Sequence, residues 1–380
     1  MESIYLDHAA TTPIAPEVRR GMAPMFEAEF ANPSSRHGPG VRVREAIEAA
    51  RARVARSISA RPEQVVFTSG GTEANNLAVL GLARAGRGKH VLVGPTEHAS
   101  VREAAKALVS EGFEVETLAL DERGDLDIER LVSRLRPDTV VVACMLVNNE
   151  FGTVSPIPRI AKLVRANAPN ARVHVDAVQG LGKLPVSFGE LGAHTLAISA
   201  HKVHGPKGTG ALVVEDGTRL RPLVFGGGQE RGLRTGTENA AGIVGFSIAV
   251  ELAANAQRKT HAHLSELRAL LADELAGLAG ARLLDVGSEH SPAIAALSLP
   301  GPPAEVWMHH LEERGVHTSV GSACQGNRGG IPPALLALGF GEEEARHILR
   351  MSFSSMTTAE EVRAGAAALR AVASGLGVKP

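Results

Sequence analysis

Short apolar runs alternate along most of the chain with stretches in which apolar residues recur every three or four positions. Short runs bounded by turn residues are typical of buried strands, and longer periodic stretches are typical of helices. We expect strands at 64–68, 90–93, 114–118, 139–144, 172–175, 195–198 and 211–214. The helices expected between them lie at 72–82, 99–109, 128–135 and 157–167. This alternation, with several strands apolar throughout, predicts an α/β fold whose mostly parallel sheet is covered on both faces.

The pattern changes after a long helical stretch at 239–275, which is interpreted as a connector. Fewer and more mixed elements follow, with strands expected at 281–284 and 294–299 and helices at 305–314 and 359–373. A chain of 380 residues exceeds the size at which a single core keeps growing. We therefore predict a large domain over residues 16–255. Residues 1–15 and 256–380 would together form a smaller α+β domain.

The composition is that of an ordinary globular enzyme, with 44% hydrophobic and 21% charged residues. A formal net charge of −1 gives no electrostatic reason to expect nucleic acid or an anionic membrane as a partner. The arginines of 42–56 alternate with Glu45 and Glu48, which is interpreted as a solvated helix face. The first residues lack the basic and apolar regions of a signal peptide, and no run approaches the roughly 18 apolar residues of a spanning helix.

The two cysteines stand in different settings. Cys144 ends an apolar strand, whereas Cys324 lies in the polar, glycine-rich stretch 321–330. A disulfide framework is therefore not expected, and a reducing cytoplasm fits the composition. An exposed thiol with Arg328 four residues further along is expected to be more acidic than a free one, so Cys324 is a candidate reactive cysteine.

Lys202 and Asp176 form the most informative pair. Lys202 follows one expected strand, and Asp176 follows the strand before it. A lysine that forms a Schiff base needs a fixed position, and a carboxylate near it can hold a protonated ring nitrogen. Pyridoxal phosphate (PLP) chemistry requires both groups. Either residue alone would favour a surface lysine or a turn-capping aspartate, but the pair in this order favours PLP.

Three further segments between strands and helices are candidates for chemistry. Residues 69–73 join a strand to a helix through two glycines, which suits a phosphate or a simple helix cap. His98 precedes a helix, where it could stay neutral and exchange protons, or only cap the helix. The glycine-rich turn 205–210 is interpreted as a tight connection into a strand. His201 and His204 are spaced like a metal pair, but Gly205 and Pro206 break any helix there, so no metal site is predicted.

The chain resembles the cysteine desulfurases, which are class V, fold-type I PLP enzymes. The match covers nearly the whole chain and consists of many ordered motifs. It runs through residues 5–13, 32–35, 67–76, 96–98, 147–150, 174–176, 199–202, 226–231, 234–237 and 321–324. The resemblance implies a large domain with a seven-stranded, mostly parallel sheet and a smaller domain that carries the Cys324 segment.

The resemblance also implies a role for each matching residue. The catalytic residues would be Lys202, Cys324 and His98. The cofactor would be held by Gly71, Thr72, His98, Asn149, Asp176, Gln179, Ser199, His201, Lys202 and Thr237, with Lys202 bound to it as a Schiff base and Thr237 reaching across from the partner subunit of a homodimer. Asn149 and Arg350 would orient the substrate carboxylate, because the arginine fork matches a carboxylate.

The implied reaction converts L-cysteine to L-alanine and leaves a persulfide on Cys324. A sulfur-acceptor protein, either a scaffold for iron–sulfur clusters or a tRNA-thiolation enzyme, would then receive the sulfur through Cys324. Selenocysteine lyase or another class V activity is the alternative within the same chemistry. A catalytically silent scaffold is the alternative outside it, and the presence of Lys202, Asp176, His98 and Cys324 together argues against it.

Two departures from the family pattern affect the expected acceptor and substrate preference. Relatives continue after the cysteine with a short Ser/Ala-rich stretch, whereas this chain has a different sequence at 325–333. Relatives also carry a second arginine shortly after the one that matches Arg350, and this chain has Ser355 there. Neither change touches the expected PLP site.

Overall fold

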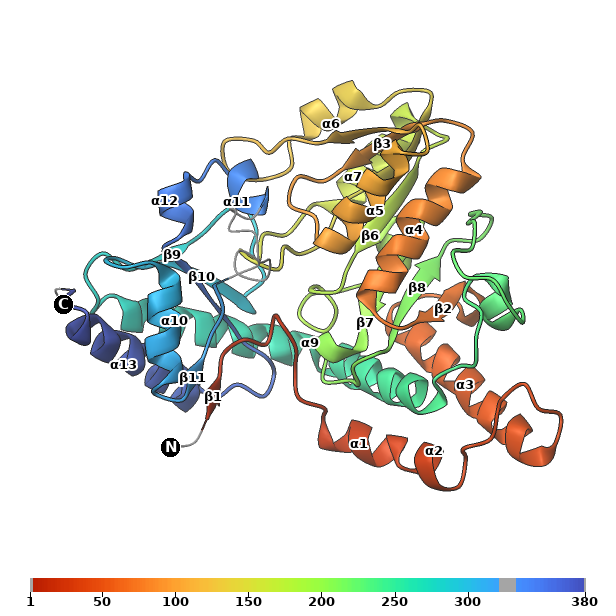
Figure 1. Cartoon of the computed structure of the whole chain (residues 1–380), viewed down its shortest axis with the longest axis horizontal. Coiled ribbons are helices and arrows are strands. Elements are labelled where there is room, and N and C mark those ends of the chain that lie inside the picture. The colour runs from red at the N-terminus through yellow and green to blue at the C-terminus, as the bar shows by residue number, and fades with distance from the viewer. Residues whose placement is uncertain (1–2, 321–332, 379–380) are drawn as a thin grey trace.

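The computed structural model describes residues 3–320 and 333–378. Within them a seven-stranded sheet has the order β2-β8-β7-β6-β5-β3-β4. The strands are β2 (Val65–Thr68), β3 (His90–Val93), β4 (Glu114–Thr117), β5 (Thr139–Ala143), β6 (Arg172–Asp176), β7 (Thr195–Ser199) and β8 (Gly210–Val214). Only β8 runs antiparallel to its neighbours, and the other pairs are parallel. The predicted α/β fold with a mostly parallel sheet is confirmed (Figure 1).

Both faces of this sheet are buried, as the apolar strands predicted. Val91 and Val93 of β3 pack in one cluster with α4 (Gly71–Ala85) and α5 (Ala99–Val109). Leu92, between them, belongs to the main core on the opposite face, because successive strand residues point to opposite sides. Helices that contribute to that core include α3 (Gly38–Ser57), α6 (Ile128–Arg134), α7 (Ile157–Asn167) and α9 (Ala240–Leu275).

A second, smaller set of strands follows α9. β10 (Ile294–Ser298) lies between β9 (Arg282–Leu284) and β12 (Ile348–Ser352) and is antiparallel to both. The N-terminal strand β1 (Ile4–Tyr5) pairs in parallel with β11 (Val316–His317). The helices of this part are α10 (Ala304–Glu312), α11 (Pro333–Ala337), α12 (Glu342–Ala345) and α13 (Ala359–Gly375).

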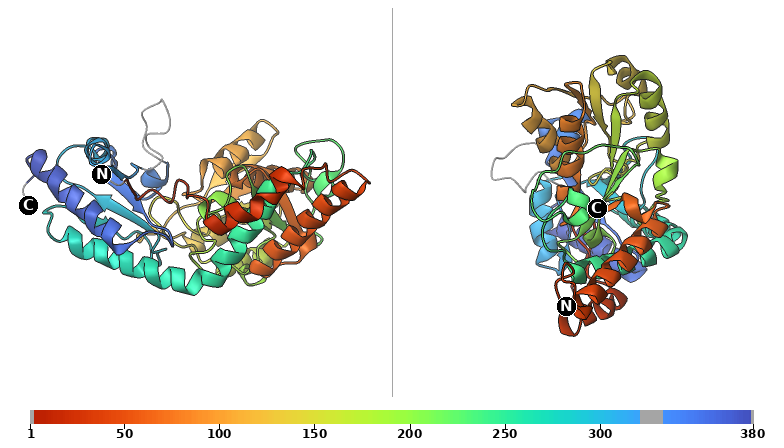
Figure 2. Two further views of the ribbon diagram at one scale, coloured as in Figure 1. Left: turned by 90° about the horizontal axis from the view of Figure 1, so that it is seen from below. Right: turned by 90° about the vertical axis from the view of Figure 1, so that its right-hand side faces the viewer.

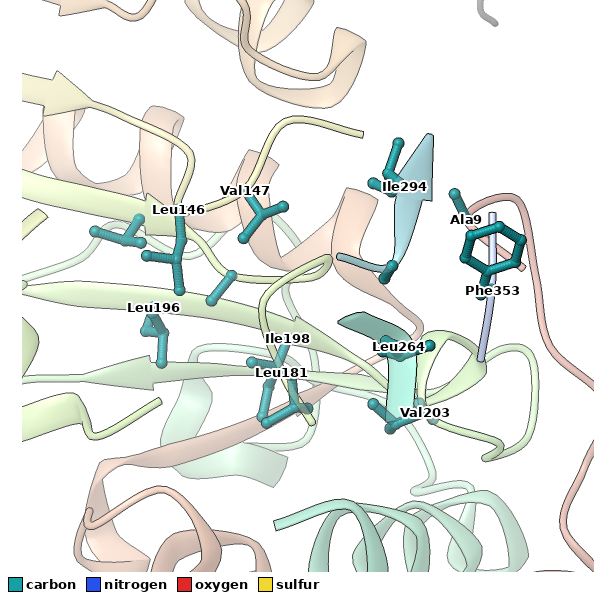
Figure 3. Close-up of a cluster of buried hydrophobic side chains, with 14 of the residues drawn as sticks. Ala9, Leu146, Val147, Leu181, Leu196, Ile198, Val203, Leu264, Ile294 and Phe353 are labelled. Carbon is teal, nitrogen blue, oxygen red and sulfur yellow. The ribbon is translucent and has the colours of Figure 1, made fainter. Parts of the chain in front are cut away.

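α9 runs along both parts of the molecule (Figure 2). It continues without a break through residues 255 and 256, where the boundary between the domains was predicted. The core is also continuous: Leu196 and Ile198 of the large sheet and Ile294 and Phe353 of the smaller part belong to one cluster (Figure 3). The division into residues 16–255 and 1–15 with 256–380 stays a prediction.

The length and composition of α9 would suffice to cross a membrane, which sequence reasoning did not anticipate. This is weak evidence, because the core helix of a globular protein meets the same criterion. Ile243, Phe246 and Val250 of α9 are buried in the main core, and α3 and α1 (Pro16–Met22) pack against the helix. These contacts are those of a core helix.

The interpretation of 42–56 as a solvated face is wrong for Arg51. Its side chain is 7% exposed and forms an ion pair of 2.7 Å with Glu230, which is 2% exposed. Glu230 also accepts the backbone N–H of Phe67 at 2.8 Å, and Arg51 donates to the carbonyl of Val65 at 3.0 Å. A buried charge needs such a partner, and Glu230 is 179 positions away in sequence, beyond any local pattern.

The remaining described elements are short. They are α2 (Pro24–Glu27), α8 (Phe188–Leu191) and the 3-10 turns η1 (Pro62–Gln64), η2 (Ala200–Lys202) and η3 (Gln229–Gly232). η2 matters most for the site, because it follows β7 directly and ends on Lys202.

Candidate active site

Asp176 ends β6 and is held by two hydrogen bonds. Asn75 of α4 donates through Nδ2 to its Oδ2 at 2.7 Å, and the backbone N–H of Val178 donates to its Oδ1 at 2.9 Å. The carboxylate is 5% exposed. Each carboxylate oxygen can accept more than one hydrogen bond, so Asp176 can still receive a ring N–H.

Asn75 connects Asp176 to two other polar residues. It donates to the hydroxyl of Ser100 at 2.8 Å, and its Oδ1 lies 3.0 Å from Nε2 of His174. Burial lowers the pKa of His174 to about 3, so its imidazole is neutral and donates from Nε2 to the amide oxygen. This arrangement fixes the orientation of the Asn75 amide, with its NH₂ group toward Asp176.

His98 is the N-cap residue of α5. Its Nδ1 accepts the backbone N–H of Ser100 at 3.1 Å and lies 2.8 Å from the Ser100 hydroxyl. An accepting Nδ1 puts the proton of a neutral ring on Nε2. Desolvation lowers the pKa of His98 despite the opposing effect of Asp176, although part of the side chain is exposed. The capping and the chemical interpretations of His98 are therefore compatible.

Lys202 lies close to the N-terminal segment. Its Nζ donates to the carbonyl of Ala10 at 2.8 Å and to that of Ala9. Gln179 also donates to the Ala9 carbonyl, at 2.9 Å. Burial, reinforced by the positive charge of Arg350, lowers the pKa of Lys202 to about 8. The amine is therefore neutral far more often near pH 7 than an ordinary lysine, as a nucleophile requires.

The strand-to-helix turn at residues 69–73 opens α4, whose first residue is Gly71. A Cβ on Gly71 would lie 2.8 Å from a methyl group of Val178 and 3.7 Å from the Cβ of Ser199, so the turn approaches β7 closely. The Ser199 hydroxyl is buried without a hydrogen-bond partner among the described residues. Free N–H groups at a helix start, an unpaired hydroxyl and His201 after β7 are suitable ligands for a phosphate.

Arg350 of β12 comes from the smaller part of the molecule. Its guanidinium is 7% exposed, donates to Asp7 at 2.8 Å and donates to the Asn149 carbonyl at 2.9 Å. Its Nε is buried and has no partner in the described part of the chain. Arg350 thus joins the Asn149 turn to the N-terminal segment, and its Nε is a donor that no described residue uses.

Two predicted residues are not placed with this group. Thr237 is exposed, and among the described residues no hydrogen bond joins it to the others. Cys324 lies outside the described residues. Ser319, five positions before it, pairs with Arg350 through backbone hydrogen bonds of 3.1 and 2.6 Å, so the chain leading toward Cys324 is tied to the site.

Sequence reasoning gave no role to four residues that shape the site. Asn75 and Asp7 stood within the quoted motifs but had no partner until the fold was known. Glu97, which precedes His98, is 2% exposed, and burial with the nearby Asp176 charge raises its pKa to about 8. Lys183 is 7% exposed and donates to the carbonyl of Lys202 at 3.1 Å. A lysine within an apolar stretch was the only sequence signal for it.

The donors and acceptors fit PLP. An accepting carboxylate at Asp176 suits the ring nitrogen, the amine of Lys202 suits the aldehyde, and the unpaired Ser199 hydroxyl beside the start of α4 suits the phosphate. These groups come from the ends of neighbouring strands, which is where α/β sheets bind ligands.

Comparison with known proteins agrees with this geometry. The family model for class-V aminotransferases matches residues 4–364. The "Putative cysteine desulfurase IscS 1" of Bacillus subtilis (strain 168) is 40% identical over 371 residues, covering 96% of this chain and 97% of that protein. Among solved structures, a "NIFS-LIKE PROTEIN" superposes with a TM-score of 0.92 at 32% identity, covering 98% of this chain and all of the other. The structure titled "SspA in complex with cysteine" superposes with a TM-score of 0.79 at 33% identity, covering 94% of this chain and all of the other.

The fold and the site thus define a PLP-dependent enzyme. The chain belongs to the class-V aminotransferase family and, within it, to the cysteine desulfurases.

Proposed function

We propose that this enzyme converts L-cysteine to L-alanine and passes the sulfur to Cys324. The observation that carries the proposal is the arrangement of Lys202, Asp176 and His98 at one edge of the sheet, with Asp176 and His98 linked through Asn75 and Ser100. Family membership supports cysteine as the substrate.

The cofactor would be held by Lys202 through its amine, by Asp176 and His98 at the ring and by Gln179 at the phenolic oxygen. Further residues would bind its phosphate. When bound, PLP supplies an electron sink for the carbanion that forms at the substrate Cα. Asp176 keeps the ring nitrogen protonated, because a carboxylate beside it favours the charged form. The phosphate ligands would be Gly71, Thr72, Ser199, His201 and the Thr237 of a partner subunit.

The chain's own residues orient the substrate and move protons. Arg350 and Asn149 would bind the substrate carboxylate, and the unpaired Nε of Arg350 gives that guanidinium a donor to offer. His98 would exchange a proton with the substrate through Nε2, which forms no hydrogen bond to another described residue. Lys202, whose pKa burial lowers to about 8 in the free protein, would also accept a proton when its amine is not bound to the cofactor.

The sulfur step needs no further reactant. The Cys324 thiolate attacks the sulfur of the substrate, the bond between that sulfur and Cβ breaks, and a sulfur–sulfur bond forms. Cβ takes the electron pair and a proton to become the methyl group of alanine. Cysteine and the Cys324 thiol thus yield alanine and a persulfide, with atoms and electrons balanced. An acceptor protein for iron–sulfur cluster assembly or tRNA thiolation would remove the terminal sulfur.

A homodimer is part of the proposal. Thr237 lies in the segment that follows η3, and the segment that precedes η3 carries Val224 and Phe225, which are 50% and 81% exposed. Exposed apolar side chains of this size are typical of an interface. A partner subunit that covers them could bring its Thr237 to the phosphate. The free thiol of Cys144 and the proposed sulfur chemistry both suit a reducing, cytoplasmic location.

The test combines product analysis with mapping of the cofactor. Reduction of PLP-loaded protein with borohydride should label the peptide that contains Lys202, and L-cysteine should yield equal amounts of alanine and sulfide in the presence of a thiol reductant. The Cys324→Ala variant should keep the label and lose persulfide formation, and Cys144→Ala is the matched control that should keep both. Label on another lysine, or alanine released only from selenocysteine, would overturn the proposal.

A further inference from the structure

Ser100, the second residue of α5, links His98 to the hydrogen-bond network around Asp176. Ser100 is 7% exposed, and its hydroxyl oxygen lies 2.8 Å from Nδ2 of Asn75 and 2.8 Å from Nδ1 of His98. A hydroxyl has one proton, so it can donate to only one of these two nitrogens. The surroundings of Asn75 decide which nitrogen receives it.

The groups around Asn75 leave a single arrangement of protons. An ionised carboxylate only accepts, so the amide nitrogen of Asn75, and not its oxygen, must face Asp176 at 2.7 Å. The amide oxygen then accepts Nε2–H of the neutral His174 at 3.0 Å. The second N–H of the amide is donated to Ser100. The Ser100 hydroxyl therefore donates its own proton to Nδ1 of His98.

His98 depends on these hydrogen bonds because packing does not enclose its ring. The residue is exposed at the start of α5, and the torsion that turns an imidazole about its Cβ–Cγ bond has only a broad preference of its own. Nδ1 accepts the Ser100 hydroxyl at 2.8 Å and the Ser100 backbone N–H at 3.1 Å. Together these two donors hold the plane of the ring and leave the proton of the neutral imidazole on Nε2.

We propose that Ser100 is a positioning residue for His98, whose hydroxyl holds the plane of the imidazole in a fixed relation to Asp176. This inference rests on the proposed role of His98. A ring that lies flat on a flat cofactor and exchanges a proton through Nε2 must keep its plane, because a displaced acid–base group slows the proton transfer. With the backbone N–H alone, the ring would be held at one point and could turn about it.

The test is Ser100→Ala, which removes the hydroxyl and keeps the backbone N–H. Nitrogen NMR of PLP-free protein labelled at histidine should show the Nδ1 resonance of His98 moving toward that of a nitrogen that accepts fewer hydrogen bonds, with Nε2 still protonated. The resonance is assigned by its absence from His98→Gln. In PLP-loaded enzyme, kcat for alanine formation should fall by roughly fivefold, the usual effect of one neutral hydrogen bond, and KM for cysteine should stay the same.

Ser110→Ala is the matched control. Ser110 lies at the other end of α5, where its exposed hydroxyl donates to the carbonyl of Ala107 at 2.8 Å, so its loss should change neither the resonance nor kcat. Should Ser100→Ala fail to fold, Ser100→Cys replaces it. A thiol is a weaker donor than a hydroxyl, so the Nδ1 resonance of His98 should move in the same direction.

The His98→Gln background separates positioning from a general structural effect. If Ser100 acts through His98, adding Ser100→Ala to His98→Gln should not lower kcat further. An unmoved Nδ1 resonance, an unchanged kcat in Ser100→Ala, or the same loss in both backgrounds overturns the proposal. A failure of the proposed function appears separately, as a wild-type enzyme that releases no alanine from cysteine. The resonance, which is measured without the cofactor, then decides alone whether Ser100 holds the ring.

Discussion

The ring end of the proposed active site is built differently from the two ends that would receive anionic groups. At the ring end, Asp176, Asn75, His174 and Ser100 satisfy one another through hydrogen bonds of 2.7 to 3.0 Å. At the ends that would receive the phosphate and the substrate carboxylate, Ser199 Oγ and Arg350 Nε are buried without a partner among the described residues. Among the described residues, the ring end is complete without a ligand, and each of the other two ends has a buried donor without a partner.

The difference reflects what each end must do. The ring nitrogen needs a carboxylate whose position and charge do not change, and a closed hydrogen-bond network supplies that rigidity. The anionic groups bring their own acceptors, so donors left unpaired in the free protein become paired on binding. An unpaired buried donor is costly, which makes it evidence for a ligand that pairs it. Changes at the ring end should therefore affect the chemical step, and changes at the anionic ends should affect binding.

The largest effect is expected from Asp176→Asn. The amide has nearly the same shape but no charge, so it can no longer keep the ring nitrogen protonated. We expect the rate of alanine formation at saturating cysteine to fall by about 10²–10³-fold, the usual effect of removing one preorganised electrostatic group. PLP should remain attached to Lys202, which the absorption spectrum and borohydride mapping would check.

Asn75→Leu should disturb the same end of the site less than Asp176→Asn does. It removes the hydrogen bond to Asp176 but leaves the carboxylate, so its rate should fall less than that of Asp176→Asn. Equal losses would mean that the geometry of the network, and not the charge of Asp176, controls the chemical step. A rate for Asp176→Asn within threefold of wild type would contradict the assignment of Asp176 altogether.

A smaller effect, mainly on substrate binding, is expected from Arg350→Lys. The lysine keeps the charge but loses the fork that holds Asp7 and the Asn149 carbonyl and has no equivalent of Nε. We expect the KM for cysteine to rise about tenfold or more, equivalent to at least about 1.4 kcal/mol, with a smaller change in kcat. Steady-state alanine release at varied cysteine concentration measures both.

Arg346→Lys provides the control for that exchange. Arg346 is exposed and pairs with Glu342 at 3.0 Å four residues away on the surface, so its replacement should leave KM unchanged. If both variants raise KM equally, the effect comes from the loss of an arginine in general. If neither does, Arg350 does not bind the substrate carboxylate.

The strength of the apolar pattern in each strand explains how much of the fold could be predicted from sequence. Strands that are apolar throughout were located to within a residue or two, because burial on both faces leaves a strong pattern. β12 was missed: its five residues are buried, but Arg350 at the centre interrupts the apolar run. β1 and β11 are two residues long and carry no periodic signal.

The site shows a similar limit. Lys202, Asp176 and His98 could be named because each follows a strand in a recognisable motif. Their partners could not be paired in advance, because Asn75 and Asp176 are 101 positions apart and Asp7 and Arg350 are 343 apart. Only the fold brings such residues together. Lys183 was missed for a related reason: a lysine in an apolar stretch gives no sign that its amine is buried.

Glu97 is the exception within the satisfied ring end and gives the smallest predicted effect. Its Oε1 accepts the backbone N–H of Met145, but its Oε2 is buried with no partner in the described structure. Burial, then the Asp176 charge, raises its pKa to about 8 from a usual value near 4.5. The folded protein therefore retains a proton that the unfolded chain loses, and stability should fall as pH rises from about 4.5 to about 8.

Glu97→Gln replaces the protonated acid by a neutral group of the same shape and should remove this pH dependence. The melting temperature of the variant relative to wild type should therefore rise between pH 5.5 and pH 8.5, by roughly 2 °C or more. Glu103→Gln, at a 67% exposed acid on α5, should show no such rise. A constant difference between Glu97→Gln and wild type across this range would mean that Glu97 is already ionised in the fold. The ring end would then hold the charge of Glu97 in addition to that of Asp176.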